Sequence, residues 1–286
     1  MPTLGTQIRL SRIINQKTQH SFCVAIDHAL HLGSCKGLER PEEMLDTVAE
    51  AGVDAVILPL GSALRHGLRL VRAGGPSLIL RLDQTTMWRE GTAIDYPDGH
   101  TRLVASVNDA VALGADAVIN YLFIAQNDPA EETRVFRATS EVNTAARAAG
   151  MVHIIETMGA RHALAKNIHD GEFVAHHSRI GFEMGADIIK TDWPGSIQDL
   201  RRVIAQCCIP VMLAGGPRGK SDRGTLELVS SIIKAGAAGI FFGRALFGAD
   251  EPLAVMRACR AIIHEQCSVD EAIDAAGFRS RCPALA

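Results

Sequence analysis

A short pattern of small and apolar residues occurs four times along the chain. Each copy contains a glycine, a turn of two residues and then an apolar run, and the copies begin at Ala51, Leu113, Met184 and Ala235. Glycine readily adopts the left-handed backbone conformation that ends a helix, and the apolar run after it is typical of a buried strand. Four junctions of this kind predict parallel strands connected by helices.

Other apolar runs raise the number of predicted strands to eight. We predict strands at residues 22–26, 55–58, 78–81, 117–121, 152–155, 188–190, 211–213 and 239–242. Eight strands that alternate with helical segments are the pattern of a (β/α)8 barrel, or TIM barrel, and their apolar character fits strands covered on both faces. A doubly wound open sheet is the alternative, but no G-x-G-x-x-G sequence follows the first strand.

The chain has no linker-like segment and no change of composition, so we predict a single α/β domain over residues 1–286. The barrel is expected at about residues 20–250, and the C-terminal helices at residues 251–286. One of these helices is predicted from Pro252 to Glu265, and a shorter one begins at about Val269.

Composition and charge restrict the classes of function. The chain is 47% hydrophobic and 21% charged, as in ordinary globular proteins. A net charge of −3 without a basic run argues against nucleic acid or a membrane surface as a partner. No apolar stretch reaches the roughly 20 residues of a transmembrane helix, and residues 1–19 lack the apolar core of a secretion signal. Seven cysteines without Cys-x-x-Cys spacing suit reduced thiols, so we expect a cytoplasmic protein.

Lys190 closes the apolar run of the sixth predicted strand. Burial disfavours the charged form of an amine, and the neutral amine is a nucleophile that condenses with a ketone or aldehyde to form a Schiff base. The alternative is a lysine at a strand end whose amine reaches back to solvent. The local sequence favours neither interpretation over the other.

Titratable residues follow several of the predicted strands. Asp27 and His28 follow the first strand, Tyr121 ends the fourth and Glu156 follows the fifth. The carboxyl ends of barrel strands meet at one mouth, where proton transfer requires such groups. Asp27 is a candidate to orient a substrate hydroxyl or to accept its proton. Its structural alternatives are a helix cap and a salt bridge to a strand-end base such as Lys190 or Arg81.

The histidines do not indicate a metal site. The segment from Asp27 to His31 contains two histidines, but no further cluster of His, Cys or Glu has ligand spacing, so we expect no metal. Four more histidines fall in a polar helical segment after the fifth strand, where we expect them at the surface: His162, His169, His176 and His177.

The ends of the last two strands are rich in glycine and arginine. Gly215 and Gly216 follow the seventh strand, with Arg218 shortly after them, and Gly243 and Arg244 follow the eighth. Glycines let backbone N–H groups approach an anion, a helix N-terminus adds positive potential, and barrels often bind phosphate at these two loops. These five residues predict a phosphate-binding site, and tight turns without a ligand are the alternative.

The chain resembles the DeoC/FbaB/LacD family of class I, Schiff-base aldolases, and in particular its FbaB-like branch. The resemblance covers about residues 22–275 and is strongest at residues 180–191, Ile-Gly-Phe-Glu-Met-Gly-Ala-Asp-Ile-Ile-Lys-Thr. Residues 210–216 and 239–247 also match, and Asp27-His28-Ala29 corresponds to an Asp-His-Gly sequence of the branch.

The resemblance implies roles for particular residues. Lys190 would be the Schiff-base lysine and Asp27 the carboxylate beside it. The substrate phosphate would be bound by Gly215, Gly216, Gly243 and Arg244. The resemblance also implies a homo-oligomer that acts on a small phosphorylated molecule and needs no cofactor.

Two departures from the family pattern bear on the reaction. Fructose-bisphosphate-type members carry Tyr-Pro-Arg-Gly after the fifth strand, and its tyrosine transfers a proton, whereas this chain has Met158 in the equivalent stretch. A methionine cannot transfer a proton, which favours the thiolase-like members that also lack the tyrosine. The seventh strand has no lysine, so the lysine pair of deoxyribose-phosphate aldolases is missing. Tyr121, Glu156 and His28 are the candidates for the missing acid–base group.

Our hypothesis from the sequence is a class I aldolase, a carbon–carbon lyase, that acts on a phosphorylated ketose or ketone. Lys190 attacks the carbonyl, and the resulting iminium withdraws electrons from the bond that breaks. One alternative is thiolase-type acyl transfer from a phosphorylated dione to coenzyme A by the same lysine. Another is a catalytically silent barrel that binds a sugar phosphate.

Overall fold

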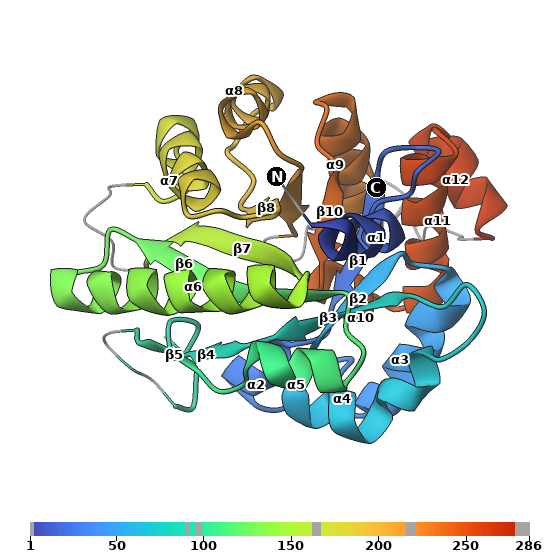
Figure 1. The fold of residues 1–286 in the computed structure, drawn as a ribbon. Coiled ribbons are helices and arrows are strands. Elements are labelled where there is room, and N and C mark those ends of the chain that lie inside the picture. Colours follow the sequence, from blue (N-terminus) through green and yellow to red (C-terminus); the bar gives the residue numbers. More distant parts are fainter. Residues whose placement is uncertain are drawn as a thin grey trace.

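The computed structural model describes residues 3–89, 92–94, 96, 99–161, 167–215 and 221–277. Eight parallel strands close into a barrel in the order β1-β10-β9-β8-β7-β6-β3-β2. They are β1 (Ser21–Ala25), β2 (Ala55–Pro59), β3 (Ser77–Arg81), β6 (Ala117–Ile124), β7 (Val152–Gly159), β8 (Ile188–Thr191), β9 (Val211–Ala214) and β10 (Gly239–Phe242). The (β/α)8 barrel is the predicted fold class, and all eight predicted strands are confirmed (Figure 1).

Helices follow the strands and surround the barrel (Figure 1). They are α1 (Leu4–Ile13), α2 (His28–Leu32), α3 (Pro41–Ala51), α4 (Leu60–His66), the 3-10 helix η1 (Gly67–Leu70), α5 (Val107–Ala112), α6 (Pro129–Ala149), α7 (Gly171–Glu183), α8 (Ile197–Cys207), α9 (Asp222–Lys234), α10 (Arg244–Phe247), α11 (Pro252–His264) and α12 (Val269–Ala275). The two predicted C-terminal helices are confirmed as α11 and α12. No helix within the described ranges is long and apolar enough to cross a membrane.

The four glycines of the repeated pattern have the backbone conformation that was expected of them. Gly52, Gly114, Gly185 and Gly236 have φ angles of 70°, 69°, 88° and 97°. Residues with a side chain are strained in this left-handed region, whereas glycine is not. The repeated pattern therefore marks the points where the chain leaves a helix and enters a barrel strand.

Buried apolar side chains form two main layers. One layer fills the space between strands and outer helices, and it contains residues such as Val24, Leu80 and Leu246. The other layer lies inside the barrel, and we call it the inner core. Its members are Ile13, Ile14, Cys23, Ala25, Ala55, Ile57, Ile79, Ala117, Ile119, Val152, Ile154, Ile188, Met212 and Phe241.

Helix α1 is not among the predicted elements. Its carboxyl end brings Ile13, and with it the following Ile14, into the inner core. Only Thr6 and Ile13 of the helix are buried, so its apolar stripe is too short to stand out in the sequence.

Two further features differ from expectation. The short strands β4 (Asp83–Thr85) and β5 (Thr101–Leu103) form an antiparallel pair that was not predicted, because three residues carry too little alternation to be recognised. His177 is buried on α7, which makes the surface prediction wrong for this residue, while His169 and His176 are exposed. His162 lies outside the described residues.

Candidate active site

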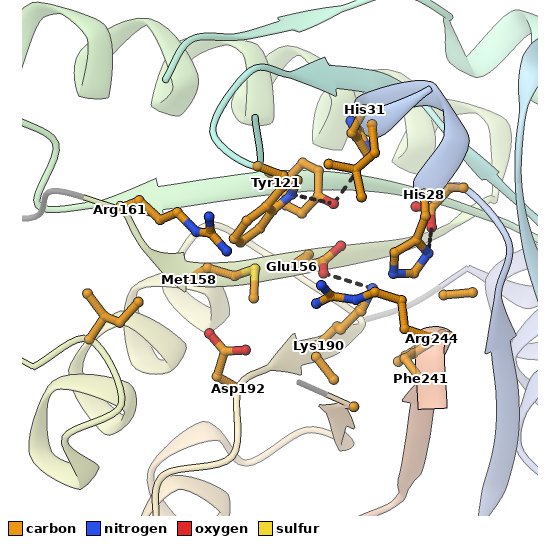
Figure 2. Close-up of a pocket in the computed structure, with 18 of the residues that line it drawn as sticks. His28, His31, Tyr121, Glu156, Met158, Arg161, Lys190, Asp192, Phe241 and Arg244 are labelled. Carbon is orange, nitrogen blue, oxygen red and sulfur yellow. Dashed lines mark hydrogen bonds and ion pairs between the residues drawn. The ribbon is translucent and has the colours of Figure 1, made fainter. Parts of the chain in front are cut away.

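The carboxyl ends of the barrel strands surround a cavity of about 160 Å³ (Figure 2). Eight of the ten predicted site residues line it: Asp27, His28, Tyr121, Glu156, Lys190, Gly215, Gly243 and Arg244. The other two, Gly216 and Arg218, lie outside the described residues. The fold therefore brings together side chains that are up to about two hundred positions apart in the chain.

Strand register places three of these side chains at one level. Tyr121 of β6 is paired with Glu156 of β7, and Glu156 is paired with Lys190 of β8. Side chains along a strand alternate between its two faces, so residues two positions apart share a face. The residue two positions before each of these three is an isoleucine of the inner core. All three side chains therefore point into the barrel, directly above the inner core.

Lys190 belongs to a buried charged network. The residue is 4% exposed, and its Nζ lies 2.7 Å from Oε1 of Glu156. The other oxygen of Glu156 accepts a hydrogen bond from Nη2 of Arg81. Nε of Arg81 donates to Oδ2 of Asp27 at 2.7 Å, and its Nη1 donates to Oδ1 of Asp83 at 3.2 Å. We call these five residues the charged network, in which one guanidinium contacts three carboxylates.

The carboxylates of the network differ in their acidity. Burial opposes the ionisation of Asp27, but Arg81 and Lys190 outweigh it and hold its pKa below the usual value. Burial likewise opposes ionisation of Glu156, and Lys190 and Arg81 again hold the pKa lower. Asp83 differs, because burial raises its pKa to about 6 in spite of Arg81. Asp27 and Glu156 are therefore ionised at neutral pH and act as hydrogen-bond acceptors and counter-ions.

The sequence predicts either a catalytic role for Asp27 or a structural one, as a helix N-cap or in a salt bridge. It stands at the N-cap position of α2, but its side chain makes no capping hydrogen bond. The salt bridge is formed with Arg81, and Asp27 also borders the cavity. The salt bridge to Arg81 therefore holds the Asp27 carboxylate beside the space that a substrate would occupy.

Tyr121 and His28 are the other predicted acid–base candidates. The Tyr121 ring lies over the Arg81 guanidinium at 4.1 Å, and its hydroxyl accepts a hydrogen bond from Nε1 of Trp88 at 3.2 Å. Oη of Tyr121 is also 3.4 Å from Nε2 of His31. Burial raises the pKa of Tyr121 and lowers the pKa of His28 to about 4, so both side chains are neutral at neutral pH.

The glycine–arginine end of the cavity combines tight packing with positive charge. A Cβ atom at Gly243 would lie 2.3 Å from Cε1 of His28 and 2.9 Å from the backbone oxygen of Ala25, so packing alone requires glycine there. Arg244 follows at the start of α10. Burial and the charge of Arg161 lower the pKa of Arg244. Both arginines line the cavity, and two guanidinium groups around one space suit an anion such as phosphate.

Four charged residues of this region are not among the predicted site residues: Arg81, Asp83, Arg161 and Asp192. Arg81 and Asp192 stand at strand ends, and alternation along β8 places Asp192 on the same face as Lys190, so a signal for Asp192 was present. Arg161 was missed because β7 continues to Gly159, four residues beyond the predicted strand.

Within the part of the chain that the structure describes, no three His, Cys, Asp or Glu side chains are grouped in a way that suits a metal ion. The acidic groups around the cavity are instead engaged with Arg81 and Lys190, apart from Asp192.

Residues 21–249 match the DeoC/LacD aldolase family. The 2-amino-3,7-dideoxy-D-threo-hept-6-ulosonate synthase 1 of Archaeoglobus fulgidus is 32% identical over 274 residues, which are 96% of either chain. The 3-hydroxy-5-phosphonooxypentane-2,4-dione thiolase of Escherichia coli is 29% identical over 276 residues, 94% of this chain and 86% of the thiolase.

Solved structures give a consistent result. A structure from a study of reaction intermediates in the Schiff base forming fructose-1,6-bisphosphate aldolase has a TM-score of 0.79 and 25% identity, over 90% of this chain and 99% of the other. The family match covers all eight barrel strands and the whole cavity. The chain belongs to the DeoC/LacD family of aldolases.

Proposed function

We propose that this protein is a class I aldolase that forms a Schiff base between Lys190 and a phosphorylated ketose or ketone. The observation that carries the proposal is the buried amine of Lys190, which borders the cavity at the carboxyl end of β8 in a barrel of this family. A related structure is described as a Schiff base forming aldolase, which supports the same chemistry here.

The charged network suits each step of Schiff-base formation. The Lys190 amine attacks the substrate carbonyl carbon, water leaves, and a positively charged iminium forms. Glu156 lies 2.7 Å from Nζ and is held in its ionised form, so it stabilises that positive charge in a buried site. A substrate hydroxyl passes its proton to a carboxylate of the cavity, the carbon–carbon bond breaks, and one product leaves as a carbonyl compound. The iminium accepts the electron pair of that bond, and the other product remains on the lysine as an enamine.

The remaining cavity residues bind and orient the substrate. Arg244 and Arg161 provide positive charge for the phosphate, and Asp27 accepts a hydrogen bond from a substrate hydroxyl. Binding energy from the distant phosphate holds the carbonyl carbon next to Nζ, which lowers the entropic cost of the reaction.

Borohydride reduction tests the proposal. Dihydroxyacetone phosphate and borohydride together should leave a stable adduct that peptide mass spectrometry locates at Lys190. Lys190→Met should abolish the adduct and reduce turnover by at least about a thousandfold. The matched control is Lys234→Met, since Lys234 is an exposed lysine of α9 outside the cavity, and it should keep both the adduct and the turnover. A missing adduct together with activity that EDTA abolishes would instead favour a metal-dependent aldolase.

Acyl transfer to a thiol is a second candidate function. It is favoured by Met158, which lines the cavity where fructose-bisphosphate-type members are expected to have a tyrosine, and by the similarity to the Escherichia coli thiolase. The same Lys190 would attack a phosphorylated dione, and coenzyme A would take the acyl group. Turnover that requires coenzyme A would favour this reaction, whereas cleavage without any thiol would favour the aldolase.

A further inference from the structure

Asp192 is a buried carboxyl group without a partner among the residues that the structure describes. It follows Lys190 by two positions, is 5% exposed and lines the cavity. Figure 2 shows its carboxyl group directed into the cavity on the same side as Met158. Its oxygens form no hydrogen bond or ion pair with any residue that the structure describes. A buried polar group normally has such a partner, so its absence indicates that the group is kept for a ligand.

The other two carboxyl groups of the cavity and the Tyr121 hydroxyl are engaged elsewhere. Asp27 and Glu156 are ion-paired with Arg81, and Glu156 also contacts Lys190. The Tyr121 hydroxyl is bound to Trp88. Met158, beside Asp192, has no titratable group. Asp192 is therefore the carboxyl group of this cavity that is left to exchange a proton with a bound molecule.

The surroundings of Asp192 suit such an exchange. Burial, and to a lesser degree the negative charge of Glu156, raise the pKa of Asp192 to about 7. Lys190 and Arg244 are the positive groups that face it, and they oppose this shift. A general acid–base group is most effective when its pKa lies near the working pH, because both protonation states are then populated.

We propose that Asp192 transfers the proton between the substrate carbon next to the iminium and the active site. The carbon–hydrogen bond breaks and the proton goes to the Asp192 carboxylate. The electron pair of that bond forms the carbon–carbon double bond of the enamine, and the iminium electron pair returns to the Lys190 nitrogen. In the direction of cleavage, the protonated Asp192 returns the proton to the enamine carbon. This inference rests on the proposed Schiff base.

Two measurements on one substrate separate Schiff-base formation at Lys190 from proton transfer by Asp192. Borohydride trapping with dihydroxyacetone phosphate reports the Schiff base, and NMR in D₂O reports exchange of the proton on the carbon next to the carbonyl. Asp192→Asn should keep the trapping at Lys190 but reduce the exchange rate by about 10² to 10⁴-fold. Asp192→Glu should restore part of the exchange. The matched control is Asp199→Asn on α8, outside the cavity, which should change neither quantity.

The pH dependence provides a readout that a structural role would not change. In the unsubstituted protein, the exchange rate should rise through about pH 7 as Asp192 loses its proton, and this rise should be missing in Asp192→Asn. Normal trapping with unchanged exchange in Asp192→Asn would overturn the role of Asp192 and leave the proposed function intact. Trapping without any exchange in the unsubstituted protein would also overturn it. No trapping at all in the unsubstituted protein would reject the proposed function and this inference together.

Discussion

The two ends of the barrel interior are built from the same strands but from opposite kinds of side chain. Toward the amino ends lies the inner core, where only Cys23 has a titratable group. Toward the carboxyl ends lies the charged network, with two cations and three carboxylates in full burial. On β3 the interior side chain is apolar at Ile79 and charged at Arg81, only two residues further along the strand.

The difference separates stability from chemistry. Burial of apolar side chains contributes about 25 cal/mol per Å² of apolar area, whereas each buried ion loses several kcal/mol of hydration that its partners only partly replace. The inner core thus contributes stability but offers no charged groups for catalysis. The charged network contributes little net stability, but it fixes charges and an amine around the cavity. Three substitutions test this comparison in the order of the size of their effects.

The largest effect is expected from removal of the network's central cation. Arg81→Met keeps much of the side-chain volume but leaves Asp27, Asp83 and Glu156 without their shared partner. We expect the free energy of unfolding to fall by about 3 to 5 kcal/mol, as for other broken buried ion pairs. Urea denaturation at neutral pH measures this change. A loss below about 1 kcal/mol would show that the network is not coupled to folding.

Asp192→Asn is expected to increase the free energy of unfolding by an amount that depends on pH. The folded-state pKa of Asp192 is raised to about 7, above its ordinary value of 3.8. The folded protein therefore holds a proton that the unfolded chain has lost between about pH 4 and 7, and stability falls as the pH rises through this window. Asparagine has no such titration. At pH 8 the variant should be more stable by a few kcal/mol, with about 4 as the upper limit, and at pH 4 the difference should vanish.

Thermal denaturation of both proteins at pH 4, 6 and 8 checks that prediction. The difference in stability between the two proteins reports the titration of Asp192 alone, because Asp83 titrates in both. A stability difference that is the same at all three pH values would contradict the raised pKa.

The smallest effect is expected in the inner core. Ile79→Val removes one buried methylene on the same strand as Arg81, and we expect a loss of about 0.5 to 1.5 kcal/mol without a change in its pH dependence. Urea denaturation at two pH values measures it, and borohydride trapping at Lys190 should remain unaffected. A loss as large as that of Arg81→Met would remove the distinction between the two ends of the barrel.

Local signals account for the parts of the fold that were predicted. The glycine junctions at Gly52, Gly114, Gly185 and Gly236 depend on a backbone preference of one residue, so they are readable from the chain alone. Helix α1 and the β4–β5 pair were not predicted, because their contacts with the barrel involve few residues with a regular spacing. The same limit applies to His177, whose neighbours in sequence are polar although its own position on α7 faces inward.

For the site, the chain alone determined which strand ends carry reactive groups, since Lys190, Glu156, Asp27 and the glycine–arginine turns follow apolar runs in the sequence. Only the tertiary structure decided how these groups act on one another. Arg81 reaches Asp27 across 54 positions and Glu156 across 75, and neither contact leaves a trace in local sequence. Acidity depends on burial and on the distance to other charges, which are properties of the closed barrel. That is why Asp27 and Glu156 stay ionised while Asp192 holds its proton close to neutral pH.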